Sequence, residues 1–344
     1  MTPSITRYIA PRWLPGGHAQ TIWPLLRKGP LPDLRRERWD TPDGDFIDLD
    51  WLPHRPGAPL VVLFHGLEGS SESPYARSLM RMLTRLGWNG VVPHFRGCSG
   101  EPNRLPRAYH SGDADEIGWI LERLATLHPQ LPRYAAGVSL GGNALLLWLG
   151  TRGRDACQTI HAAAAVCPPL DMAAAGHNLS KGFNRLYTRH FLATLKHNAA
   201  AKLRQHPELF DLEAMLRTTN LYEFDNLVTA PLHGFRDTDD YWHRASSKAH
   251  LKEISIPTLV INPLNDPFLP ASFLPSRKDV SSFVTLEQPE EGGHVGFVSG
   301  GWPGHLDWLP ERLVHFFTTS HNSCPLPAPG MGTSWCTAYN PDFI

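Results

Sequence analysis

The 344-residue sequence predicts an α/β fold, in which a mostly parallel, doubly wound sheet carries a helical cap insertion. Two observations lead to this prediction. Continuous apolar runs such as residues 60–64 (LVVLF) alternate with stretches of helical periodicity, which is typical of parallel strands buried on both faces. A mainly helical stretch over 171–245 then interrupts the alternation, and another apolar run, 256–262, resumes it.

The first elements follow from turn and capping residues. Residues 1–36, rich in Pro, Arg and Trp, are expected to form a lead-in segment packed on the main domain, so His18 is expected to pack there rather than to bind a ligand. Asp43-Gly44 is a hairpin turn signal inside 37–64, which predicts an opening β-meander.

Helices and strands then alternate. Helices are expected from Pro74 to a stop at Gly87 and from about 111 to 128, with further strands at 90–95 and before residue 137. Right-handed crossovers make such a β–α–β series a parallel sheet.

We expect the main domain to span 37–318, with the helical cap at about 171–245. The insertion spreads Lys, Arg and His among aromatic residues, and a cap over the active site is favoured because the sheet resumes immediately afterwards. The alternative is a solvated helical subdomain without catalytic duty. The last strand is expected at 282–287 and a closing helix at 306–317. The tail, 319–344, lacks periodicity and is expected to be disordered.

Residues 137–141 read G-V-S-L-G and fit G-x-S-x-G, the nucleophile elbow of α/β-hydrolases. A β-type stretch precedes the motif and an apolar helical stretch follows it, as the motif requires. The sharp turn would present the hydroxyl of Ser139 and aim the backbone N–H of Leu140 at a developing oxyanion. The alternative is an ordinary strand-to-helix turn.

A serine nucleophile needs a base and a carboxylate that orients the base, in the chain order Ser, Asp/Glu, His. Asp266 follows the strand at 256–262, and His294 lies in a Gly-flanked loop after the last strand. Ser139, Asp266 and His294 are therefore the predicted triad. The alternatives considered are Asp237, Asp239, Asp240 and Asp279 for the carboxylate and His305 for the base.

The second oxyanion donor is expected just after the run at 60–64. That run ends in His65-Gly66, the place where α/β-hydrolases put this donor, and we assign the role to the N–H of Leu67.

Several motifs together resemble the YheT-type α/β-hydrolases, a family of medium-chain esterases and of monoacylglycerol and phospholipid lipases. The resemblance spans roughly residues 10–318 and rests on G-H-A-Q-T-I (17–22), H-G-L-E-G (65–69), F-R-G-C-S-G-E-P-N-R (95–104), Y-H-S-G (109–112), G-V-S-L-G-G-N (137–143) and G-H-V-G-F (293–297). It implies the α/β-hydrolase fold, ester hydrolysis and the same triad.

Three further residues lie in these family-like blocks. Arg96 is expected to pair with a carboxylate and hold its loop. The sequence places no general base for Cys98, so Cys98 is not expected to be a second nucleophile. His110 and Asp115 fit an H-x-x-x-x-D spacing discussed for acyltransferases, but helix capping by residues 111–113 explains that stretch.

Composition limits the classes of partner that the protein is expected to bind. A formal net charge of −1 argues against nucleic acid as the main partner. The five cysteines are odd in number and form no C-x-x-C, which predicts reduced thiols and no zinc site. The N-terminus has no signal-peptide pattern, and no apolar run approaches membrane-spanning length, so we expect a cytoplasmic protein with at most peripheral membrane contact.

The predicted function is that of a serine carboxylic ester hydrolase that acts on short- to medium-chain acyl esters through an acyl-enzyme. No cofactor or metal is expected, and the partner is a small-molecule or lipid-like ester. Two alternatives remain: alcohol O-acyltransfer by the same triad, and a non-catalytic binding protein that kept the fold.

Overall fold

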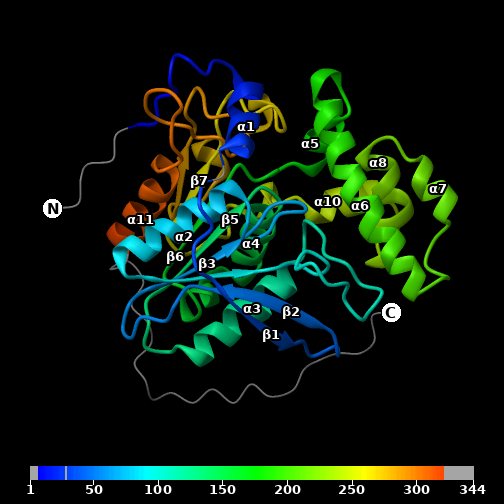
Figure 1. The fold of residues 1–344 in the computed structure, drawn as a ribbon, viewed down its shortest axis with the longest axis horizontal. Helices are drawn as coiled ribbons and strands as arrows, with labels where there is room; N and C mark the ends of the chain where they lie inside the picture. The colour runs from blue at the N-terminus through cyan, green and yellow to red at the C-terminus, as the bar shows by residue number, and fades with distance from the viewer. Residues whose placement is uncertain (1–6, 28, 321–344) are drawn as a thin grey trace.

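The computed structural model describes residues 7–27 and 29–320. An eight-stranded sheet forms its centre, with strand order β1-β2-β4-β3-β5-β6-β7-β8 (Figure 1). The strands are β1 (Arg35–Asp40), β2 (Phe46–Trp51), β3 (Leu60–Phe64), β4 (Asn89–Pro93), β5 (Arg133–Val138), β6 (Ala162–Val166), β7 (Thr258–Ile261) and β8 (Val284–Glu287).

Helices precede, cover and follow the sheet. They are α1 (Gly17–Leu26), α2 (Pro74–Leu86), α3 (Ala114–Leu127), α4 (Leu140–Arg152), α5 (Met172–Leu179), α6 (Arg185–Gln205), α7 (Leu212–Arg217), α8 (Leu221–Phe224), α9 (Ala230–Leu232), α10 (Thr238–Ala245) and α11 (Trp308–Ser320).

The sheet confirms the predicted α/β architecture. β3 to β8 are parallel, and β1 and β2 add an antiparallel edge. Helices α3 and α4 pack on one face and α2 and α11 on the other, giving two apolar cores on either side of the strands. β3 and β6 are buried throughout, as their continuous apolar sequences require.

The prediction of an opening β-meander over 37–64 is wrong in one respect. β1 and β2 form the predicted hairpin, but β4 lies between β2 and β3. After β3 the chain crosses over through α2 and forms β4 on the side of β3 that faces β2. There β4 pairs with β3 in parallel and with β2 in antiparallel fashion.

Three boundaries also differ. Arg35 and Arg36 belong to β1 rather than to the lead-in segment, and Thr319 and Ser320 belong to α11 rather than to the tail. α11 begins at Trp308, two residues later than expected. The remainder of the predicted tail, 321–344, lies outside the described residues.

Residues 171–245, all of them described, contain α5 to α10 and no strand. In Figure 1 these helices stand to the right of the sheet, and α1 lies near the loop that follows β7. We call residues 171–245 the cap. None of the described helices has the length and apolar character needed to cross a bilayer.

Candidate active site

Ser139 lies in the sharp turn between β5 and α4. Its backbone has φ 52° and ψ −120°, a conformation that a non-glycine residue adopts only when its surroundings hold it. A Cβ at Gly137 would lie 2.5 Å from the carbonyl oxygen of Gly141, and a Cβ at Gly141 would lie 2.4 Å from that of His65. The two glycines of the motif are therefore required by close backbone contact.

The structure brings the three predicted triad residues together. His294 Nε2 lies 3.0 Å from Ser139 Oγ, and His294 Nδ1 lies 2.9 Å from Asp266 Oδ2. A carboxylate only accepts, so Nδ1 carries the proton and Nε2 is free to accept from the serine hydroxyl. Phe268 N–H donates to Asp266 Oδ1 at 2.8 Å and fixes the carboxyl group. The three residues follow β5, β7 and β8, whose carboxyl ends share one edge of the sheet.

Leu67 and Leu140, the predicted oxyanion donors, line the same cavity as Ser139 and His294. Among the described residues, neither backbone N–H has an acceptor. Neighbouring residues fix the loop that carries Leu67: Gly66 N–H donates to Tyr75 Oη at 2.9 Å, and Glu68 N–H donates to Tyr109 Oη at 2.8 Å. Two unused donors held beside the serine are what an oxyanion site needs.

The cavity at Ser139 is narrow and mostly apolar. Its volume is about 80 Å³, and the cap supplies much of its wall through α5, α6, α8 and α10. The cap residues in the wall are Met172, Ala175, Gly176, Leu179, Phe191, Leu221, Asp225 and Trp242. A larger cavity of about 470 Å³ lies between residues 96–109 and the cap, and Ser139 is not in its lining.

The lead-in segment contributes to the site, which sequence reasoning missed. Gln20 is fully buried, and its Oε1 accepts hydrogen bonds from Asn265 Nδ2 and Gly292 N–H, both at 2.9 Å. Thr21 Oγ1 accepts from His294 N–H at 2.8 Å. α1 thus holds the loops that carry Asp266 and His294. The G-H-A-Q-T motif at 17–21 was the available signal.

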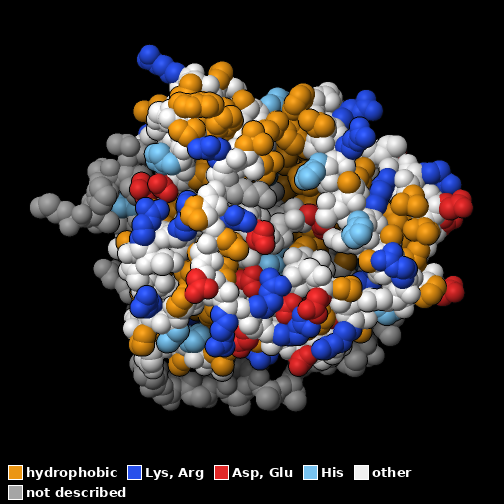
Figure 2. Space-filling view, viewed as in Figure 1, with side chains coloured by type: hydrophobic (Ala, Val, Ile, Leu, Met, Phe, Trp, Pro, Cys, Tyr) orange, Lys and Arg blue, Asp and Glu red, His pale blue; other side chains and the backbone are white. Residues whose placement is uncertain are grey.

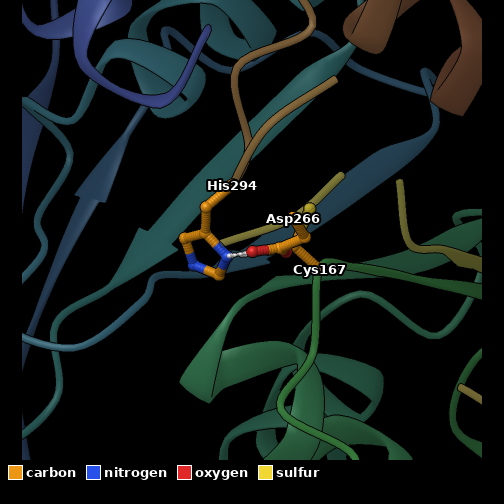
Figure 3. Close-up of side chains that lie close together, drawn as sticks. All are labelled: Cys167, Asp266 and His294. Carbon is orange, nitrogen blue, oxygen red and sulfur yellow. Dashed lines mark hydrogen bonds and ion pairs between the residues drawn. The ribbon is translucent and has the colours of Figure 1, made fainter. Parts of the chain in front are cut away.

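Cys167 is a second feature that the sequence did not reveal. It follows β6 with φ 49°, and its Sγ accepts a hydrogen bond from Val295 N–H at 3.3 Å. Figure 3 shows its side chain beside the Asp266–His294 pair. The Cys167 sulfur, an Asp266 carboxylate oxygen and a His294 ring nitrogen lie within 4.8 Å of one another. Burial raises the pKa of the Cys167 thiol well above its usual range. The neutral thiol therefore packs against the pair as a hydrogen-bonding group.

The rival residues lie elsewhere. Asp237 caps α10, with Asp239 and Asp240 in its first turn, and Asp279 forms a capping box with Ser276. His305 is exposed and lies 3.5 Å from Asp307. None of these side chains lines the cavity at Ser139.

The residues of the family-like blocks have structural contacts. Arg96 is buried and pairs with Glu116 at 2.6 Å, Asp43 at 2.9 Å and Asp45 at 3.2 Å, so the predicted pairing with a carboxylate is present. Burial raises the pKa of the Cys98 thiol. The Asp113 side chain accepts from Glu116 N–H, which confirms helix capping in that stretch.

The fold and this arrangement of side chains define an α/β-hydrolase. Residues 59–300 match the family model of the alpha/beta hydrolase fold, and the chain belongs to that family.

Its relatives include the "Putative esterase YheT" of Escherichia coli (strain K12), 39% identical over 92% of this chain and 94% of that protein. Phospholipase ABHD3 of Mus musculus is 31% identical over 91% of this chain and 79% of its own length. In structure, the Pyrococcus furiosus esterase Pf2001 superposes with a TM-score of 0.54 at 15% identity, over 83% of this chain and 92% of that one. These relatives place the chain among the esterase-like α/β-hydrolases, as the sequence predicted.

Proposed function

We propose that this protein is a serine carboxylic ester hydrolase for short- to medium-chain acyl esters, working through an acyl-enzyme. The observation that carries the proposal is the 3.0 Å contact between Ser139 Oγ and His294 Nε2, with Asp266 on the other imidazole nitrogen. A serine hydroxyl is a weak nucleophile without such a base.

In the proposed mechanism, Ser139 Oγ attacks the acyl carbon while His294 Nε2 takes its proton. The N–H groups of Leu67 and Leu140 stabilise the oxyanion, and loss of one such donor typically raises the barrier by about 3 kcal/mol. His294 then gives the proton to the leaving alcohol. Water, deprotonated by His294, then attacks the acyl carbon. The bond to Ser139 Oγ breaks, the acid leaves, and His294 returns the proton to Ser139 Oγ.

The cavity supports an acyl group of limited length. Its wall is mostly carbon and its volume of about 80 Å³ is small, which suits a short aliphatic chain better than a peptide or a long acyl chain. Ser139 does not line the larger cavity near residues 96–109, so the proposal places the acyl group in the smaller one.

Nitrophenyl esters of increasing acyl length test the proposal. We expect turnover of butyrate and octanoate esters to exceed that of palmitate, and Ser139→Ala to lower kcat by about 10⁴-fold or more. Ser255→Ala is the matched control, because Ser255 precedes β7 at the opposite edge of the sheet and does not line the cavity.

A fluorophosphonate probe separates an enzyme from a non-catalytic binder. Native protein should carry the label on Ser139, located by peptide mass spectrometry, and denatured protein should not. Equal absence of label in both would contradict the proposal. Added ethanol then measures how the acyl group divides between water and alcohol.

A further inference from the structure

Large apolar side chains are exposed beside the active site. We name five of them the apolar rim: Leu25, Leu26, Phe183, Leu186 and Trp302. Trp302 is 71% exposed and Leu26 69% exposed. In Figure 2, hydrophobic side chains gather at the top of the molecule, over α1 and over the neighbouring end of the cap. An exposed apolar patch of this kind marks an interaction surface.

Contacts join the two halves of the rim into one surface. Trp13, Trp23 and Trp302 form a cluster with ring centroids 5.1 to 5.4 Å apart. The His18 ring, on α1, lies 4.5 Å from that of Phe183 in the cap, and His18 Nδ1 lies 3.1 Å from Tyr187 Oη. Lead-in segment and cap therefore meet at the rim.

A series of ring contacts links the rim to the site. The His294 ring stacks on Phe268 with centroids 3.9 Å apart, and Phe268 contacts Tyr187 at 5.0 Å. Tyr187 in turn contacts Phe183, an exposed rim residue, at 6.0 Å. The rim is thus three ring contacts away from the proposed base.

The two stretches that supply most of the rim are basic. The chain as a whole has a net charge of −1, yet residues 1–32 and 172–207 contain no Asp or Glu. These stretches carry exposed cations, Arg12, Arg27, Lys181, Arg185 and Arg189, whereas Asp33 and Asp307 line a groove that also holds Leu26 and Arg27. The acid Glu290, which lies near this face, is paired with Arg7 at 3.3 Å. The segments that supply most of the apolar rim therefore carry exposed basic side chains and no acidic ones.

We propose that the apolar rim docks this protein on a lipid bilayer with anionic headgroups. Exposed Trp, Phe and Leu side chains enter the interfacial layer, and the arginines and lysine of these segments contact lipid phosphates. Charge complementarity favours a bilayer over a second copy of the chain, because two copies would bring like charges together. Docking would place the proposed esterase site next to ester lipids, and this consequence, unlike the docking itself, rests on the proposed function.

Vesicle co-sedimentation of the full chain carrying Ser139→Ala tests docking without ester turnover. We expect it to sediment with vesicles of phosphatidylcholine mixed with phosphatidylglycerol, and at least fivefold less with phosphatidylcholine alone. Added salt should weaken binding to the anionic vesicles, since exposed charges are screened.

Paired variants identify the surface. Leu26→Ser with Phe183→Ser, one change in each half of the rim, should weaken vesicle binding at least fivefold. Leu127→Ser with Phe283→Ser is the matched control and should bind as before, because these residues are 53% and 44% exposed but lie outside the rim. Thermal unfolding midpoints show that both pairs fold.

Arg185→Gln with Arg189→Gln should reduce binding to the anionic vesicles and leave the weak binding to phosphatidylcholine unchanged. The proposal is overturned if the full chain sediments with neither vesicle, or if the rim variants bind like the control. It is also overturned if sedimentation velocity shows a dimer that the rim variants dissociate. Failure of the proposed ester hydrolysis would appear instead as an unlabelled Ser139.

Discussion

Asn265 Nδ2 donates a hydrogen bond to Gln20 Oε1 at 2.9 Å, although the two residues lie 245 positions apart in the chain. The same oxygen accepts Gly292 N–H. One buried amide therefore connects the loop of Asp266 with the loop of His294, and the lead-in segment becomes part of the active-site framework.

Replacing this amide should slow catalysis. We expect Gln20→Leu to lower kcat about 10- to 100-fold with little change in KM, because a small displacement of reacting groups is costly while the acyl cavity stays intact. Steady-state kinetics on nitrophenyl butyrate measure both constants. Gln130→Leu, at an exposed position, is the control. An unchanged kcat in Gln20→Leu would show that α1 does not position the triad.

Cys167 should act through its hydrogen bond. Cys167→Ala leaves Val295 N–H without its acceptor, so kcat should fall about 3- to 10-fold, the effect of roughly one hydrogen bond. Cys167→Ser keeps an acceptor and should stay within about twofold of the parent enzyme. Cys157→Ala controls for loss of a thiol elsewhere. Equal activity of the Ala and Ser variants would rule out this role.

Arg96 should matter for stability. It is buried among Glu116, Asp43 and Asp45, and Arg96→Met would remove the cation that pairs with all three carboxylates. Breaking a buried ion pair in this way typically costs about 3–5 kcal/mol. Urea denaturation should show a loss of that size, against almost none for the exposed Arg154→Met. A loss below about 1 kcal/mol would contradict the structural role.

Acid should destabilise the fold through His65. Burial lowers the pKa of His65 to about 3, and its Nε2 accepts a hydrogen bond from Phe95 N–H, so the folded protein holds the ring neutral. The unfolded chain takes up a proton below its ordinary pKa of about 6.5. Stability is therefore lost as the pH falls from about 6.5 towards 3, with about 2 kcal/mol gone by pH 5.

His65→Gln removes this titrating group and supplies an oxygen acceptor near the position of Nε2. The variant should lose about 2 kcal/mol less than the parent protein between pH 7 and pH 5, measured by urea denaturation at both values. His190→Gln changes an exposed histidine and should keep the parent dependence. Identical pH dependence in parent and His65→Gln would mean that His65 is not kept neutral by the fold.

Local patterns predicted most of the architecture. Three local patterns specify structure through neighbouring residues: the apolar run at 60–64, helix α2 with a proline at its start and a glycine at its end, and the G-x-S-x-G turn. Ser139, Asp266 and His294 could be chosen because parallel strands end at one edge of the sheet, so the position after a strand locates a side chain.

Long-range contacts could not be predicted this way. Gln20 and Cys167 reach the triad loops across more than 100 residues, and no periodicity records such a pairing. The position of β4 between β2 and β3 likewise depends on how the α2 crossover returns, which the strand sequences leave open. The family-like G-H-A-Q-T motif marked Gln20 and Thr21 but not what they bind.

The contact between Thr21 and His294, 273 positions apart, also bears on biosynthesis. At ordinary translation speeds of about 5–20 residues per second, the ribosome takes on the order of tens of seconds to make the partner of an α1 that has already emerged. During that interval Trp13 and Trp23 lack Trp302, against which they later pack, so we expect the nascent chain to bind chaperones. The proposed site would then be complete only after His294 has been made.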